Sequence, residues 1–217
     1  MRAAFLSPVH RRHIATLRSS PAAIDEEGLR IGGQYVMFFA EAKLMRQHAL
    51  RLVAGVAKPE VLEVGLGLGV FAAQLASMSV GSYTAIEPHE DLAHLAERRV
   101  LHELGKATVI TEPWQVTNLP ADAYDAIMYD TWPPDGHADS DFAAFVEHVA
   151  VPCLRPGGRF SFFHSGSAIN DSRRQVLDRH FAGWTAHPYT MPAEQTPVHW
   201  TKPTRDFLIP IAVKGGK

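Results

Sequence analysis

A glycine-rich turn and an acidic residue roughly 20 positions after it are the first residues in this sequence that could hold a ligand. Gly65, Gly67 and Gly69 follow the apolar run Val61–Val64 and precede a segment with a helical pattern. Glycine permits positive φ angles and lets the backbone approach a bound molecule closely. Glu87 ends the next predicted strand, where a carboxylate can accept hydrogen bonds from both hydroxyl groups of a ribose. A tight turn and a solvated glutamate would also fit, but the combination favours a nucleotide or nucleoside ligand.

A second acidic residue, Asp130, ends the fourth predicted strand and is followed by the aromatic turn Thr131-Trp132-Pro133. In an open α/β sheet, ligands bind at the carboxyl ends of the strands, where the winding reverses. If the strands run in the order 3-2-1-4-5, the fourth strand neighbours the first, and Asp130 faces the crevice beside the glycine turn. An aspartate that only caps the next loop is the alternative. We favour a position in the ligand crevice.

The segments that must position these residues alternate between strand and helix patterns. Strands are expected at Val61–Val64, Tyr83–Ile86, Ala107–Thr111, Tyr124–Tyr129 and Arg159–Phe163, with helices at Val70–Met78, His89–Leu104, Asp141–Leu154 and Ser172–Phe181. Such alternation indicates βαβ units and a parallel sheet. Thr185–Tyr189 and Phe207–Val213 have no helix between them and are predicted to pair antiparallel at the sheet edge. The predicted fold class is therefore α/β, with a doubly wound, Rossmann-like, mostly parallel sheet and an antiparallel edge pair.

The first 57 residues are expected to form a helical lid over this sheet. Residues 1–33 contain many Pro, Gly and Ser and are predicted to be irregular or loosely helical. The segment Gln34–Ala54 contains neither Pro nor Gly, and we predict one helix there with Glu41 in its middle. The chain would then form a single domain, residues 1–217, with the lid at 1–57 and the Rossmann-like core at 58–217.

Composition excludes several other classes of protein. The chain has 217 residues, a formal net charge of -2 and no strong basic patch, so we expect no nucleic-acid partner. Its single cysteine, Cys153, excludes an internal disulfide and a Cys-based zinc site. No apolar run reaches the ~18 residues of a membrane span and no signal peptide is evident, which favours a cytoplasmic protein. The 12 histidines form no metal pattern, and His10 and His13 are expected in a solvated arm without acidic partners.

The spacing of the glycines distinguishes between two kinds of nucleotide ligand. A dinucleotide site requires G-x-G-x-x-G, so that the pyrophosphate lies at the helix N-terminus. Here Gly69 comes one residue early and Val70 holds the third position, which argues against a dehydrogenase. The segment 61–69 and the turn Leu154–Gly158 instead resemble class I S-adenosylmethionine-dependent methyltransferases. The resemblance implies S-adenosylmethionine as cofactor, bound by Glu63, Gly65, Gly67, Gly69, Glu87, Pro88, Trp114, Gln115 and Asp130.

A narrower resemblance begins at Tyr129-Asp130-Thr131-Trp132-Pro133, which is similar to the Y-D-T-Y-P segment of the guanidinoacetate N-methyltransferase family. Leu29-Arg30-Ile31, Val36-Met37, Glu41 and Met45 resemble the N-terminal region of the same family. The resemblance implies that Glu41 and Asp130 are the catalytic pair that grips the guanidino group. It places the acceptor against Glu41, Met45, Asp130, Thr131, Trp132, Ser165, Gly166 and Ser167. Without it, Glu41 would be interpreted as a surface glutamate of an amphipathic helix.

Two carboxylates suit the chemistry of such an acceptor. A guanidinium keeps its proton at neutral pH, so its nitrogens are poor nucleophiles. Paired carboxylates can accept its forked N–H donors, and one of them can take the proton during methyl transfer. We therefore expect an N-methyltransferase that acts on a small guanidino acid, guanidinoacetate-like or arginine-like. The segment 197–205, with His199, Trp200, Lys202 and Arg205, is expected to change the size of the acceptor pocket.

Three alternatives remain open at this point. One is an arginine N-methyltransferase for a peptide or protein, although no docking domain follows the predicted sheet. Another is a small-molecule N-methyltransferase for a different substrate class. The last is a module that binds S-adenosylmethionine without catalysing a reaction.

Overall fold

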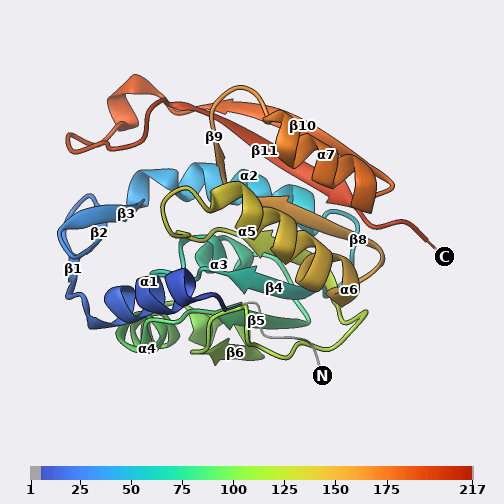
Figure 1. Cartoon of the computed structure of the whole chain (residues 1–217), viewed down its shortest axis with the longest axis horizontal. Coiled ribbons are helices and arrows are strands. Elements are labelled where there is room, and N and C mark those ends of the chain that lie inside the picture. The colour runs from blue at the N-terminus through green and yellow to red at the C-terminus, as the bar shows by residue number, and fades with distance from the viewer. Residues whose placement is uncertain (1–5, 217) are drawn as a thin grey trace.

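The computed structural model describes residues 6–216, and an eight-stranded sheet forms its centre (Figure 1). The parallel part has the strand order β6-β5-β4-β7-β8. In chain order these strands are β4 (Glu60–Val64), β5 (Ser82–Ile86), β6 (Ala107–Ile110), β7 (Tyr124–Tyr129) and β8 (Leu154–Phe162). The predicted order 3-2-1-4-5 is confirmed, and β7 lies directly beside β4.

Antiparallel strands extend the sheet beyond β8. Strand β11 (Asp206–Val213) pairs antiparallel with β8, and β10 (Gly183–Thr190) pairs antiparallel with β11 at the edge. The short strand β9 (His164–Ser165) also pairs with β11. The predicted edge pair is confirmed. The connection between β10 and β11, which contains the 3-10 turn η4 (Ala193–Gln195), returns toward the N-terminal part of the chain (Figure 1).

Helices cover both faces of the sheet. Val61 and Leu62 are neighbours in β4 but belong to different buried clusters, because successive side chains of a strand point to opposite faces. The first cluster contains residues of α2 (Ala42–Leu52), α3 (Val70–Leu75), α4 (Glu90–Arg99) and the 3-10 turn η2 (Leu101–Leu104). The second contains residues of α5 (Ala138–Phe145), the π-helical turn η3 (Val146–Ala150), α6 (Val151–Cys153) and α7 (Asp171–His180).

The N-terminal part differs from the predicted helical lid. A helix, α1 (Pro8–Ser19), is followed by a three-stranded antiparallel sheet of β1 (Ala22–Ile24), β2 (Gly28–Ile31) and β3 (Gln34–Phe38). Gly32 and Gly33, with φ of 57° and 86°, form the two-residue turn that joins β2 to β3. The prediction of one helix over Gln34–Ala54 is therefore wrong. The first five residues of the predicted lead-in lie outside the described residues.

Glu41 takes a different position as a result of this change. It ends the 3-10 turn η1 (Phe39–Glu41) between β3 and α2, and does not lie in the middle of a helix. None of the helices within residues 6–216 is both long and apolar enough to cross a membrane.

Candidate active site

A cavity of about 360 Å³ lies at the carboxyl ends of β4, β5 and β7. Helix α1 and strands β2 and β3 contribute to its other walls. Its size falls in the range of small-molecule sites, which is roughly 300–1,000 Å³. The predicted site residues that line it are Glu41, Gly65, Gly67, Glu87, Pro88, Trp114, Gln115, Asp130, Thr131 and Trp132.

The glycine turn brings the end of β4 against the end of β7. A Cβ atom on Gly65 would lie 1.7 Å from the backbone oxygen of Asp130, and the residue has a φ of +92°. Only glycine fits this position, because any side chain would push the two strand ends apart. The backbone N–H of Asp130 donates to the Val64 oxygen at 2.8 Å. The turn and the second acid are therefore held side by side, as the sequence predicted.

The carboxylate of Glu87 is buried and held in a fixed orientation. Its Oε2 accepts the Gly67 N–H at 2.8 Å, and its Oε1 accepts the His89 N–H at 3.0 Å. Burial raises the pKa of Glu87, and the two backbone donors oppose that shift. Each oxygen keeps acceptor capacity, since an ionised carboxylate offers about four lone-pair sites.

An unpartnered polar atom shows where a ligand would fit this cavity. Gln115 lines the cavity, and its buried Oε1 atom has no hydrogen-bond partner within the described part of the chain. Buried polar groups normally have partners, so this oxygen is suited to contact a polar ligand. Together with Glu87 and the glycine turn, it fits a nucleoside cofactor that carries an amino-acid group.

The two acids predicted to be catalytic line the same cavity. Glu41 is 2% exposed, and its Oε2 accepts the Phe38 N–H at 2.9 Å. Its Oε1 lies 3.2 Å from the Nζ of Lys202. Burial raises the pKa of Glu41, and the positive charge of Lys202 opposes the shift. Burial and the negative charge of Glu41 raise the pKa of Asp130 from 3.8 to about 7, again opposed by Lys202.

Asp130→Asn is expected to stabilise the folded protein at about pH 8. An acid whose pKa is raised on folding contributes stability that is present below its unfolded pKa and lost as the pH rises through its folded pKa. Asparagine has no such titration, so the free energy of unfolding should rise by about 4 kcal/mol at about pH 8. The difference should disappear below the unfolded value of 3.8. Urea unfolding at both pH values measures it, with Asp135→Asn as an exposed control. A gain that is independent of pH would contradict the prediction.

Helix α1 is docked on the cavity through long-range contacts. His10 is buried, with its Nε2 2.6 Å from Asp141 Oδ1 and its Nδ1 2.6 Å from Ser7 Oγ. The Nε2 of His13 lies 2.8 Å from the Trp132 oxygen, and Arg18 donates to the Pro88 oxygen at 2.8 Å. The expectation of a solvated arm without acidic partners is therefore wrong for His10.

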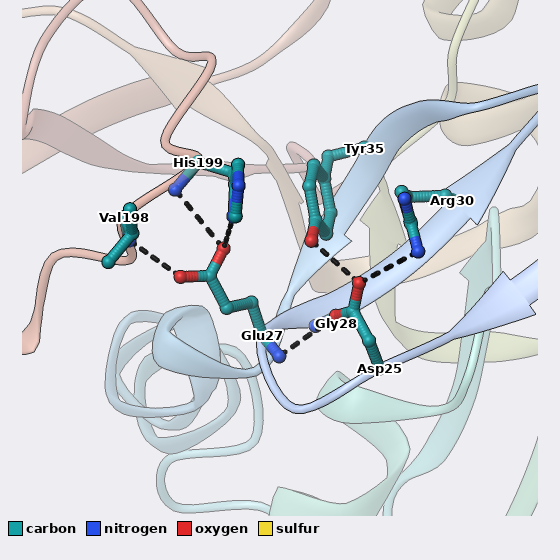
Figure 2. A network of polar contacts seen from close by, with 7 residues as sticks. All are labelled: Asp25, Glu27, Gly28, Arg30, Tyr35, Val198 and His199. Atoms are coloured by element: carbon teal, nitrogen blue, oxygen red, sulfur yellow. Dashed lines mark hydrogen bonds and ion pairs between the residues drawn. The ribbon is translucent and has the colours of Figure 1, made fainter.

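A polar latch joins the N-terminal sheet to the connection between β10 and β11 (Figure 2). Glu27 accepts the backbone N–H groups of Val198 and His199 at 2.6 and 3.1 Å, and its Oε2 lies 2.9 Å from His199 Nδ1. On the same turn, Asp25 accepts the Tyr35 hydroxyl at 2.7 Å (Figure 2). Burial raises the pKa of Glu27, but its hydrogen bonds with His199 and the backbone outweigh this and leave the pKa lowered. The latch holds the segment that carries Lys202 against the cavity.

The remaining predicted site residues lie outside the cavity lining. Glu63 is buried and accepts a hydrogen bond from the Tyr83 hydroxyl, and burial raises the pKa of Glu63 well above its usual range. Gly166 donates its N–H to the Asp206 oxygen at 2.8 Å. Met45 lies in α2 and belongs to a buried cluster, and Gly69 directly precedes α3. The proposed ligand roles of Glu63, Met45, Gly69, Ser165, Gly166 and Ser167 stay predictions.

Sequence reasoning did not place His10, Asp141 or Phe163 in this site, although all three line the cavity. His10 and Asp141 are 131 positions apart, so no local pattern connects them. Lys202 was expected only to alter the size of the pocket. Among residues 6–216, no three His, Cys, Asp or Glu side chains form a group that could hold a metal ion.

The fold and the site together define a class I methyltransferase that uses S-adenosylmethionine. N-methyltransferase NodS from Bradyrhizobium japonicum has a TM-score of 0.63 at 15% identity, over 82% of this chain and 97% of that one. Magnesium protoporphyrin IX methyltransferase (ChlM) from Synechocystis, with bound S-adenosylmethionine, has a TM-score of 0.58 at 13% identity, over 81% of this chain and 80% of that one.

The family is shown by the sequence. The profile described as guanidinoacetate N-methyltransferase matches residues 15–182, more than half of the chain, and the chain belongs to this family. Protein arginine N-methyltransferase 2 from Yarrowia lipolytica is 33% identical over 138 residues, which cover 59% of this chain and 28% of that protein. The protein of the same name from Emericella nidulans is 28% identical over 61% of this chain and 31% of its own length. The matched part therefore spans less than a third of either relative.

Proposed function

We propose that this methyltransferase transfers a methyl group to a guanidino nitrogen of a small guanidino acid, guanidinoacetate-like or arginine-like. The observation that carries the proposal is that buried Glu41 and half-buried Asp130 line one cavity with the Gly65 turn and Glu87. One part of that cavity suits a nucleoside, and the other suits a planar cation. Membership of the guanidinoacetate N-methyltransferase family supports the same acceptor class.

The cofactor is proposed to bind on the side of the cavity formed by the glycine turn. We assign the ribose hydroxyls to Glu87, with Gly65 and Gly67 as the backbone that the ligand approaches. Trp114, Gln115 and Pro88 line the same cavity, where Trp114 offers an apolar surface and Gln115 an unpaired oxygen. Bound there, S-adenosylmethionine supplies an electrophilic methyl carbon on a positively charged sulfur.

The acceptor is proposed to bind at the acidic pair. Glu41 and Asp130 accept the forked N–H donors of the guanidinium and fix its plane. As the nitrogen–carbon bond forms and the carbon–sulfur bond breaks, one guanidinium proton passes to a carboxylate. Asp130 suits that role, because a base with a pKa of about 7 is half ionised near neutral pH. Alignment of the reacting atoms would supply much of the remaining rate enhancement.

The N-terminal residues favour a small acceptor. We propose that residues 1–57 act as a lid on a core of residues 58–217 within a single domain. His10 and Arg18 join α1 to Asp141 and to the Pro88 oxygen, and a site covered by this helix would exclude water during the reaction.

An arginine side chain of a peptide or protein is the second candidate. The names of the curated relatives favour it, since both are protein arginine N-methyltransferases. The same carboxylate pair would grip that guanidino group. The two candidates differ in what surrounds the acceptor and not in the chemistry at nitrogen.

A competition assay separates the two candidates. The enzyme and methyl-labelled S-adenosylmethionine are incubated with guanidinoacetate, free arginine, an arginine-containing peptide and a folded arginine-bearing protein. The methylated products are identified by mass spectrometry. We expect turnover of a free guanidino acid. Methylation of the folded protein with no turnover of any free guanidino acid would contradict the proposal.

A further inference from the structure

A lysine side chain of this protein stands where the proposed function places the acceptor's cation. Lys202 lies on the connection between β10 and β11, and its side chain is 20% exposed. Its Nζ is 3.2 Å from Glu41 Oε1 and 4.5 Å from the centre of the Phe163 ring. Lys202 and Phe163 both line the cavity with Glu41 and Asp130. One internal ammonium group thus offsets part of the negative charge of the two acids.

The contact between Lys202 and Glu41 leaves acceptor capacity on the carboxylate. The Nζ of Lys202 lies 3.2 Å from Oε1 of Glu41, which is a buried atom. The other oxygen of Glu41 accepts the Phe38 N–H. An ionised carboxylate offers about four lone-pair sites, so Lys202 offsets the charge of Glu41 without using all of its acceptor capacity.

The lysine also has a second environment within reach. A second, polar pocket of about 420 Å³ also has Lys202 as a lining residue. The Asp206 carboxylate and the hydroxyl groups of Thr190 and Thr204 line this pocket, although Arg205 does so too. The latch at Glu27 fastens the backbone at Val198 and His199 (Figure 2). Rotation of the Lys202 side chain therefore needs no release of the segment.

We propose that Lys202 is a specificity-determining residue that occupies the guanidinium position until a guanidino group displaces it into the second pocket. The proposal rests on the proposed function, because it assigns the acceptor's cation to Glu41 and Asp130. A simple amine would only replace the Lys202 ammonium with another ammonium and would form no additional hydrogen bonds. A planar guanidinium donates to both carboxylates at once, so it can displace the lysine. Lys202 thereby selects guanidino compounds against amines.

The test compares ligand binding by the wild-type protein and Lys202→Met, each saturated with S-adenosylhomocysteine. Calorimetry measures the Kd of guanidinoacetate, of carboxylate-free methylguanidine and of ethylamine. Without the competing ammonium, the variant should bind both guanidino compounds roughly tenfold more tightly and should gain measurable affinity for ethylamine. Lys43→Met, which removes an exposed lysine two residues from Glu41, is the matched control and should change none of these values. Lys202→Gln, which keeps a polar head, should repeat the gain.

Several results would overturn the inference. If Lys202→Met weakens guanidinoacetate but not methylguanidine, Lys202 binds the acceptor's carboxylate and is not a placeholder. If the wild-type protein binds guanidino compounds and both Lys202 variants bind them no more tightly, the inference alone fails. If S-adenosylhomocysteine binds but no guanidino compound binds to any variant, the proposed function fails and the inference falls with it.

Discussion

Asp130→Asn is expected to slow methyl transfer by about a thousandfold while the affinity for S-adenosylmethionine changes by less than about threefold. Asparagine keeps the shape of the side chain but can neither carry the negative charge nor accept the guanidinium proton. The cofactor contacts proposed at Glu87 and the Gly65–Gly67 turn do not use the Asp130 carboxylate, so they remain in the variant. Single-turnover assays with saturating acceptor, together with calorimetry for the cofactor, measure the two quantities.

The matched control for this variant is Asp135→Asn, an exposed aspartate of the same loop, which should keep near-native turnover. The rate of methyl transfer should also fall in Glu41→Gln, because this substitution removes the other carboxylate of the pair. A stable Asp130→Asn protein with near-native turnover would show that this residue is structural. The gain in stability predicted for the same substitution makes that distinction possible, since the variant should fold at least as well as the wild type.

Glu87→Ala is expected to weaken S-adenosylmethionine binding by roughly 30- to 1,000-fold, or about 2–4 kcal/mol. The substitution removes the proposed acceptor of both ribose hydroxyls. It also leaves the N–H groups of Gly67 and His89 without their present partner, so the glycine turn becomes less ordered. Calorimetric titration with S-adenosylmethionine, checked by thermal unfolding of the free protein, measures the effect.

Two further variants separate the roles of Glu87. Glu87→Gln keeps one acceptor oxygen for the backbone and should lose less affinity than Glu87→Ala. Glu90→Ala, an exposed acid at the start of α4, should bind the cofactor normally. Unchanged cofactor affinity in Glu87→Ala would contradict the assignment of the ribose hydroxyls to Glu87. This result would be independent of the roles of Glu41 and Asp130.

The parts of the fold that could be predicted from the sequence depend on short-range patterns. Gly65, Glu87 and Asp130 each follow a strand with a clear apolar pattern. The carboxyl ends of parallel strands meet at one edge of the sheet, so the strand order alone brings these residues together. No contact between side chains had to be known in advance.

The prediction for the N-terminal part was wrong because a helical period was assigned to residues 34–54, which begin as a strand. Apolar residues in the segment 34–54 fit a helix only approximately, and its first third is rich in the aromatic and β-branched residues that suit strands. Gly32-Gly33, which precedes it, is a two-residue turn signal for a hairpin. The hairpin signal should have outweighed the absence of Pro and Gly further along the chain.

The contacts that complete the site could not be predicted locally. His10 meets Asp141 from 131 positions away, and Glu27 meets His199 from 172 positions away. Lys202 reaches Glu41 only because β10 and β11 bring their connection back across the sheet edge. Each pair depends on packing between elements that are distant in the sequence, which periodicity and spacing do not encode.

The central claim is that Glu41 and Asp130 together hold a guanidino group next to the cofactor. A crystal structure of the enzyme with S-adenosylhomocysteine and the free guanidino acid that turns over fastest tests it most directly. We predict that guanidino nitrogens will lie within hydrogen-bond distance, roughly 2.7–3.2 Å, of both carboxylates, with one nitrogen facing the cofactor's sulfur. A guanidino group bound elsewhere, with neither Glu41 nor Asp130 in contact with it, would contradict the account.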